Sequence, residues 1–142
     1  MIVEELKEKG AIYIPNIEDG FLYYSHYLME GSSEEITHQL EELIKENGYE
    51  HSYVDFYYGR LTEEERKRVE AALLKEELEF LNNLNTADSI YFPLTDPLFK
   101  LTLKLSLSEL LFSTYYFCKT PCTVWGNYNH VFPVFYETIE KE

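Results

Sequence analysis

The sequence predicts an α+β fold, in which an antiparallel β-sheet of about five or six strands, mostly C-terminal, carries two main acidic amphipathic helices on one face. Helix signals concentrate in the N-terminal half, and strand-like, aromatic-rich segments dominate the C-terminal half. Charge follows the same division: residues 30–50 hold seven acidic residues and one basic residue, whereas residues 85–136 hold three of each. We interpret this asymmetry as helices outside and sheet inside a single globular domain, residues 1–142.

Length and composition set the class of protein. The chain has 142 residues, 45% of them hydrophobic, and a formal net charge of −14, which is typical of an acidic globular domain. No apolar run reaches the length of about 18 residues that a membrane span requires, and the charged N-terminus does not resemble a signal peptide. We therefore expect a cytoplasmic protein whose Cys118 and Cys122 stay reduced.

Two helices have clear start and stop signals. Residues 2–9 predict a short helix that ends at Gly10. Residues 32–48 predict a longer one, in which Ser32 and Glu35 form a capping box and Gly48 ends the helix. Its apolar stripe consists of Ile36, Leu40, Leu43 and Ile44.

A third helical segment allows two interpretations. Thr62 and Glu65 form a second capping box, and the pattern could continue to residue 84. In one continuous helix, Glu70 and Glu77 would project between two apolar lobes as a pair of carboxylates in an apolar groove. Alternatively, the helix breaks near Lys75-Glu76 and the pair is partly exposed.

Several segments have strand patterns. Residues 99–108 alternate between apolar and polar side chains over their whole length, which predicts a strand with one dry and one wet face. Residues 110–118 and 122–136 predict the arms of a terminal hairpin around the loop 119–121. Gly126 and Pro133 suggest a bulge and an edge or strand end within the second arm. Further strand candidates are residues 11–16, 21–29, 49–59 and 89–94.

The chemical motifs in the sequence are weak. Cys118, Cys122 and His130 would need a fourth ligand to close a zinc site, and only one cysteine pair is present. A cysteine nucleophile would need His130 together with Asn127 or Asn129, but regular pairing puts the histidine on the opposite strand face. The chain has no glycine-rich phosphate loop. We therefore predict no metal ion and no cofactor, and we expect the two cysteines to oppose each other across the mouth of the hairpin.

Tyrosine is unusually abundant, with thirteen residues in the chain. Most of these rings are expected to pack the sheet, but doublets such as Tyr57-Tyr58 put one ring on each face, so that some rings lie away from the core. Exposed tyrosines among carboxylates suit the binding of a Lys- or Arg-rich protein surface. The predicted partner-binding residues are Glu34, Glu35, Glu41, Glu42, Glu46, Asp55, Tyr53, Tyr57 and Tyr58.

The charge directs the functional hypotheses. An acidic surface repels nucleic acid and anionic lipid but attracts a basic protein. In size, charge and aromatic content, though not in any motif, the chain is similar to immunity proteins that neutralise toxins. The first hypothesis is therefore an inhibitor that occludes the basic active site of a toxin, such as a nuclease. The alternative is a small enzyme or ligand-binding domain with an aromatic pocket that uses Glu70, Glu77 and His51 or His130. A third interpretation is a homo-oligomeric structural protein.

Overall fold

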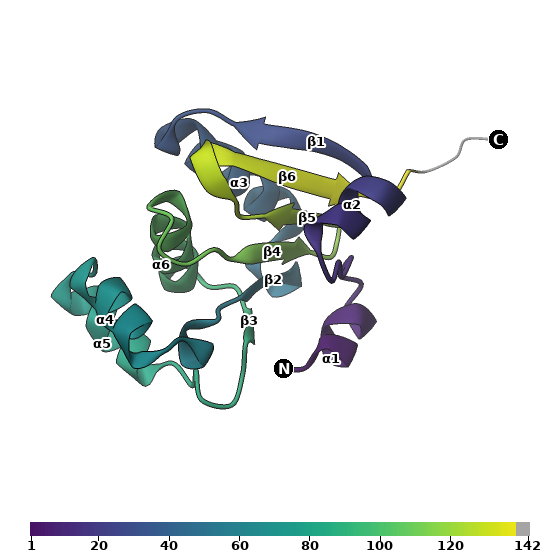
Figure 1. Ribbon diagram of the computed structural model, residues 1–142. Helices are drawn as coiled ribbons and strands as arrows, with labels where there is room; N and C mark the ends of the chain where they lie inside the picture. Colours follow the sequence, from purple (N-terminus) through teal and green to yellow (C-terminus); the bar gives the residue numbers. More distant parts are fainter. Residues whose placement is uncertain (139–142) are drawn as a thin grey trace.

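The computed structural model describes residues 1–138 and confirms the α+β class; the last four residues of the predicted domain lie outside the described residues. Six antiparallel strands form one sheet in the order β1-β6-β5-β4-β2-β3 (Figure 1). The strands are β1 (Ser25–Glu30), β2 (Ser52–Asp55), β3 (Tyr91–Pro93), β4 (Thr114–Phe117), β5 (Cys122–Trp125) and β6 (Val131–Tyr136).

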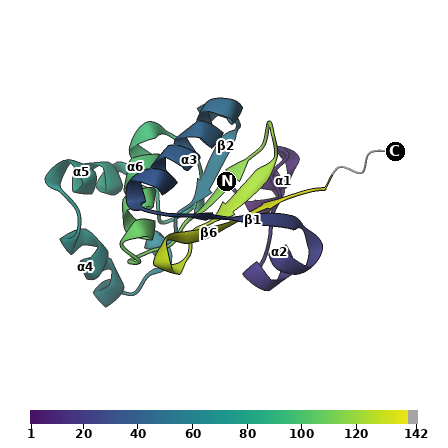
Figure 2. The same cartoon turned by 90° about the horizontal axis from the view of Figure 1, so that it is seen from above.

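Helices cover both faces of this sheet. Figure 2 shows α3 and α6 on one side and α1 and α2 on the other, with α4 and α5 next to each other at one end of the molecule. The helices are α1 (Val3–Glu8), α2 (Ile17–Tyr23), α3 (Ser33–Asn47), α4 (Glu63–Ala71), α5 (Lys75–Asn83) and α6 (Asp96–Leu107).

Alternating side chains of the sheet belong to two separate cores. On one face, Tyr115 of β4 shares a 2.8 Å hydrogen bond with the hydroxyl of Thr102 on α6. On the other face, the Thr123 hydroxyl of β5 donates to the carbonyl of Ile12 at 2.6 Å. The core beneath α3 and α6 is the larger one. The core beneath residues 1–24 contains Leu6, Tyr53, Tyr91 and Tyr116, beside a small cluster of Ile12, Ile14 and Phe135.

The first two helix predictions are confirmed. Gly10 follows α1 with a φ of +99°, in the left-handed region that glycine adopts readily. At the start of α3, the Glu35 amide donates to the Ser32 hydroxyl and the Ser32 amide donates to the Glu35 carboxylate, both at 3.1 Å. Gly48 ends α3 with a φ of +83°. These signals are local, so they do not depend on the rest of the fold.

The third helical segment is broken into two helices, as one of the two interpretations predicted. The capping box of Thr62 and Glu65 starts α4, but a second helix, α5, begins only at Lys75. The amide of Leu74 donates to the Glu77 carboxylate at 2.8 Å. Glu77 therefore helps to start a new helix and does not continue an old one.

The strand predicted for residues 99–108 is wrong, because this segment forms most of α6. Thr95 caps the helix with its side chain, and Pro97 lies in the first turn, where its missing N–H has no helical partner to lose. The hydroxyl of Thr102 is satisfied within the helix and by Tyr115, so a polar residue can be buried there. Alternation is misleading here because the helix is buried on most of its circumference. Its buried residues are Leu98, Phe99, Leu101, Thr102, Leu103, Leu105 and Ser106.

The other strand predictions are confirmed only in part. Residues 11–16 form no strand, and residues 17–23 belong to α2, which Asn16 caps, so β1 starts only at Ser25. The segments 49–59 and 89–94 contain the shorter strands β2 and β3. The first hairpin arm and its loop are present, but the second arm ends at Trp125. After a turn at residues 126–130, the chain returns as β6 between β1 and β5.

The end of α3 is tied to the β4–β5 turn by one buried side chain, Asn47. Its Oδ1 accepts hydrogen bonds from the amides of Lys119 at 3.0 Å and Thr120 at 2.7 Å. Its Nδ2 donates to the carbonyl of Leu43 at 2.9 Å. A single amide side chain therefore satisfies two backbone donors of the turn and holds α3 against the sheet.

Replacing Asn47 with alanine is expected to lower the free energy of unfolding by about 2–3 kcal/mol, because two turn amides lose their acceptor. Urea unfolding measures the change. Asn83→Ala is the matched control: Asn83 is exposed and makes one bond to the Glu79 carbonyl within α5, so its loss should change stability by less than about 0.5 kcal/mol. Equal effects of the two substitutions would contradict the role assigned to Asn47.

Candidate functional site

The five glutamates of α3 that were predicted to bind a partner are all exposed. They share the helix with a single basic residue, Lys45. The ion pairs found among residues 1–138 involve acids of α4, α5 and α6, and none includes a glutamate of α3. The negative charge of this helix is therefore not neutralised within the described part of the chain. The glutamates are Glu34, Glu35, Glu41, Glu42 and Glu46.

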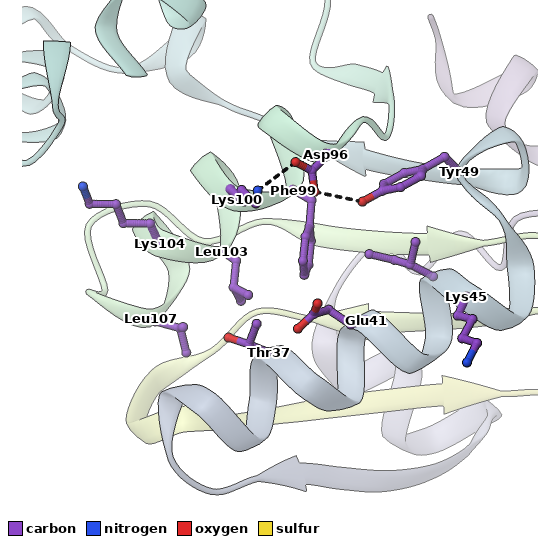
Figure 3. Close-up of a pocket in the computed structure, with 11 residues that line it drawn as sticks. Thr37, Glu41, Lys45, Tyr49, Asp96, Phe99, Lys100, Leu103, Lys104 and Leu107 are labelled. Carbon is purple, nitrogen blue, oxygen red and sulfur yellow. Dashed lines mark hydrogen bonds and ion pairs between the residues drawn. The ribbon is translucent and has the colours of Figure 1, made fainter. Parts of the chain in front are cut away.

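A groove of about 600 Å³ lies on one side of α3, between α3 and α6 (Figure 3). We call it the α3–α6 groove. Apolar side chains from both helices form much of its wall, and Glu41 and Thr37 of α3 project toward it. Its lining residues are Thr37, Glu41, Ile44, Lys45, Tyr49, Asp96, Phe99, Lys100, Leu103, Lys104 and Leu107.

One end of the α3–α6 groove is bounded by a polar chain of three residues. The Tyr49 hydroxyl donates to Asp96 Oδ1 at 3.4 Å, and Lys100 Nζ lies 2.9 Å from Asp96 Oδ2 (Figure 3). Nearby, Lys104 is paired with Glu77 of α5 at 2.7 Å. The two α6 lysines that line the groove, Lys100 and Lys104, are thus already paired with carboxylates. Glu41, on the α3 side of the groove, has no ion-pair partner among the described residues.

Two adjoining hollows, of about 560 and 550 Å³, lie on the other side of α3. Both are lined by Tyr27, Leu43 and Glu46, and we call them together the β1–α3 groove. Glu42 lines the first hollow and Tyr136 the second. The rings of Tyr27 and Tyr136 lie 6.2 Å apart between centroids. Carboxylates of α3 and half-exposed tyrosine rings therefore line this groove together.

The tyrosines beside α3 are not the ones that the sequence suggested. Tyr27, Tyr49 and Tyr136 are 46%, 37% and 38% exposed and line the grooves on the two sides of the helix. Tyr49 directly follows α3 in the chain, which is a signal that could have identified it. Tyr27 and Tyr136 are neighbours only because β1 pairs with β6, and no local sequence pattern predicts that pairing.

The structure separates the other predicted site residues from α3. Tyr53 and Asp55 are buried on the opposite face of the sheet, at 7% and 5% exposure. Tyr57 is partly exposed but lies beside Asp55 in a different pocket. Tyr58 donates its hydroxyl to Glu70 at 3.0 Å. Of the predicted set, the five glutamates therefore lie on α3, Asp55 and Tyr57 line an aromatic pocket behind the sheet, and Tyr53 and Tyr58 belong to neither.

This aromatic pocket is a cavity of about 220 Å³ on the face that residues 1–24 cover. Asp55 Oδ1 accepts a hydrogen bond from the Thr114 amide at 2.8 Å. Burial raises the pKa of Asp55 to about 7, and the hydrogen bond from Thr114 opposes part of that shift. The lining residues are Tyr13, Ile14, Pro15, Asp55, Tyr57, Tyr91, Phe112, Thr114, Tyr116, Trp125 and Gly126.

The carboxylates of the alternative hypothesis serve different contacts. Glu70 on α4 accepts the hydroxyl of Tyr58, and Glu77 on α5 binds the Leu74 amide and Lys104. His51 is exposed, and the Nε2 of His130 lies 3.2 Å from the Leu107 carbonyl. These contacts give the two glutamates structural roles on separate helices.

The two cysteines lie at the β4–β5 hairpin, where Cys122 pairs with Phe117 and Cys118 follows directly. Both thiols are free. Burial raises the pKa of Cys118 to about 11 and that of Cys122 to about 12, so both are neutral thiols at pH 7 and poor nucleophiles. Within residues 1–138, no cluster of three or more His, Cys, Asp or Glu side chains is arranged to hold a metal ion.

Comparison of the chain with protein families, curated proteins and solved structures finds no match. Among residues 1–138, no helix has the length and apolar character needed to cross a membrane.

The raised pKa of Asp55 predicts a pH-dependent stability. The folded protein binds more protons at Asp55 than the unfolded chain between about pH 4 and pH 7, so the free energy of unfolding falls as pH rises through that range. Relative to Asp55→Asn, which cannot ionise, the wild type should lose about 2–4 kcal/mol, since one pKa unit corresponds to about 1.4 kcal/mol. Urea unfolding of both proteins across this range measures the difference. A difference that does not change with pH would contradict the buried, titrating carboxyl.

Proposed function

We propose that this protein is a binding protein for a basic protein partner and that it acts as an immunity-type inhibitor, covering the basic active site of a toxin with the surface around α3. The observation that carries the proposal is the row of five exposed glutamates on α3 without ion-pair partners among the described residues. Unneutralised carboxylates on a rigid helix create a fixed negative potential, which attracts a basic surface and speeds encounter with it.

The grooves beside α3 offer anchoring sites for partner side chains, which charge alone does not provide. Steering by charge raises the association rate, but affinity depends on buried anchors in well-packed pockets. Tyr27 and Tyr136 on one side of the helix and Tyr49 on the other are half-exposed rings next to carboxylates. Such rings can receive cation–π contacts from lysine or arginine side chains and exclude water around the ion pairs. The apolar walls of the two grooves can accept the methylene stems of the same side chains.

The inhibitory mechanism that we infer is occlusion. A toxin that acts on a phosphate-containing substrate, such as a nuclease, holds that substrate with lysine and arginine side chains. Glu41, Glu42 and Glu46 of α3 would occupy the places of the substrate phosphates and keep the substrate away. This mechanism requires no catalytic group in the inhibitor. It requires only that the carboxylates remain exposed and that α3 stays fixed on the sheet, as Asn47 holds it.

Neutralising α3 should slow capture of the partner. The bait is the wild-type protein, presented at low and high salt to the basic proteins encoded beside its gene and to lysate of the native organism. We expect a basic toxin-like protein to bind at low salt, with nanomolar or tighter affinity, and to associate more slowly as salt increases. The variant Glu41→Gln/Glu42→Gln/Glu46→Gln should associate at least about ten-fold more slowly.

The matched control for this experiment is Glu63→Gln/Glu64→Gln/Glu76→Gln. It changes the net charge by the same amount, but at exposed positions of α4 and α5. It should leave the association rate within about two-fold of wild type, because charges far from the interface are screened. Equal losses in both variants would show a general effect of net charge, and a complete lack of basic binders would refute the proposed function.

The tyrosines beside α3 should control dissociation. Tyr27→Ala and Tyr49→Ala are each expected to raise the dissociation rate of the identified complex by about ten-fold or more, as for aromatic anchors at interfaces. Their association rates should change little. Tyr23→Ala is the control, because Tyr23 is 72% exposed but belongs to α2 on the other side of the sheet. Surface plasmon resonance separates the two rates, and an unchanged dissociation rate in both test variants would exclude these rings as anchors.

A further inference from the structure

The aromatic pocket takes no part in the proposed function, because it lies on the other face of the sheet from α3. Strand alternation establishes this separation: Tyr115 contacts α6, and its neighbour Tyr116 lines the aromatic pocket. The strands β2, β3, β4 and β5 and the segment of residues 13–15 all contribute to the lining. Most folded domains fill such a position with apolar side chains, whereas this one retains a cavity with a carboxylate in its wall.

Asp55 is the only formally charged residue among those that line the pocket. It is 5% exposed, and its Oδ1 is satisfied by the Thr114 amide. No lysine, arginine or histidine is among the residues that line the pocket. A buried carboxylate normally has a cationic or hydrogen-bonding partner, because an unpaired charge in a low-dielectric site is strongly unfavourable. When Asp55 ionises, its charge therefore has hydrogen bonds from Thr114 but no cationic partner in the pocket lining.

The rest of the lining suits an organic cation. Besides Asp55 it includes four tyrosines, a phenylalanine and a tryptophan. The hydroxyl of Tyr91 interacts with those of Tyr57 and Tyr13, and Tyr91 and Tyr116 pack edge to face at 6.2 Å between centroids. Phenol oxygens accept hydrogen bonds, and aromatic walls stabilise cations with an organic surface. An anionic ligand would be repelled by the Asp55 carboxylate, and the lining contains no basic residue to offset that repulsion.

We propose that the aromatic pocket binds a primary alkylammonium group, whose N–H donors reach the Asp55 carboxylate while its alkyl chain packs against the aromatic rings. The ammonium supplies the missing positive charge, and the volume of about 220 Å³ suits a short aliphatic amine. Two sources share this chemistry: a free small amine and the side chain of a lysine in a peptide. The site is independent of the α3 surface, so its failure would leave the proposed function intact.

Binding should depend on pH through Asp55. Burial raises its pKa to about 7, whereas an alkylammonium stays protonated well above that pH. The other ionisable side chains of the lining are the phenols of Tyr13, Tyr57, Tyr91 and Tyr116. Burial raises the pKa of Tyr57, Tyr91 and Tyr116 above the ordinary value of a phenol. The Lys7 ammonium lies 5.3 Å from the Tyr13 ring centroid but is not part of the pocket lining. The ionisation of Asp55 between about pH 6 and pH 8 is therefore expected to control binding.

The test uses n-butylammonium chloride as the probe and n-butanol as its neutral counterpart, at constant ionic strength. The Thr114 amide and the Trp125 indole N–H report binding in ¹H–¹⁵N spectra of the wild-type protein. We expect saturable shifts with n-butylammonium, at least about ten-fold weaker binding of n-butanol, and an affinity about ten-fold higher at pH 8 than at pH 6. Equal binding of the two probes, or an affinity independent of pH, would overturn the proposal.

Two variants connect the result to the pocket. Asp55→Asn should weaken n-butylammonium binding at least about ten-fold, as read from the Trp125 indole. Tyr57→Ala, at a partly exposed position of the lining, provides a second test that does not alter the buried carboxyl and should weaken binding about three-fold or more. Tyr23→Ala should have no effect. Unchanged affinity in both pocket variants would place the amine elsewhere and refute the assignment.

A final arm distinguishes the sources of the amine. Nα-acetyl-lysine N-methylamide carries the same alkylammonium on a peptide-like backbone. If it binds within about three-fold of n-butylammonium, the pocket accepts a lysine side chain of a protein; binding at least about ten-fold weaker identifies a free small amine as the ligand. Both results support an alkylammonium site and differ only in where the group comes from.

Discussion

Coverage of both faces of the sheet is the constraint on which the rest of the structure depends. Every residue of β2 and β4 is buried, which requires apolar or well-satisfied side chains in both directions from the same strand. The adjacent residues Tyr115 and Tyr116 show how this is met, because one ring packs toward α6 and the other toward the N-terminal segment. Tyrosine suits that requirement at the four buried positions Tyr53, Tyr91, Tyr115 and Tyr116, because a large ring fills space on either face of the sheet.

The same constraint distributes charge. A buried sheet leaves little room for carboxylates inside, so the acidic residues gather on helices, and α3 exposes five of them. Asp55 is the exception, since it lies in a central strand and is almost fully enclosed. Its raised pKa is the physical consequence of keeping a carboxyl group where water has little access. The exposed acids of α3 suit long-range attraction of a large partner, whereas the enclosed acid suits short-range recognition of one small group.

The position of α3 depends on contacts that are distant in sequence. Asn47 binds turn amides more than seventy residues away, and the β1–α3 groove requires β1 to pair with β6. The tyrosines that flank α3 come from three separate parts of the chain. Contacts that hold the helix and its flanking rings in place before binding would limit the entropy lost when a partner binds.

The sequence by itself determined the fold class, the boundaries of α3 and the exposure of its glutamates, because capping boxes, glycine stops and helical periodicity act within a few residues. It did not determine that residues 99–108 form a helix: alternation of leucine with small polar residues fits a strand, and only burial beneath the sheet makes the helix favourable. It also could not place Asp55 and Tyr57 on the opposite face from α3. Strand order decides which side chains become neighbours, and strand order is a property of long-range pairing that only the tertiary structure sets.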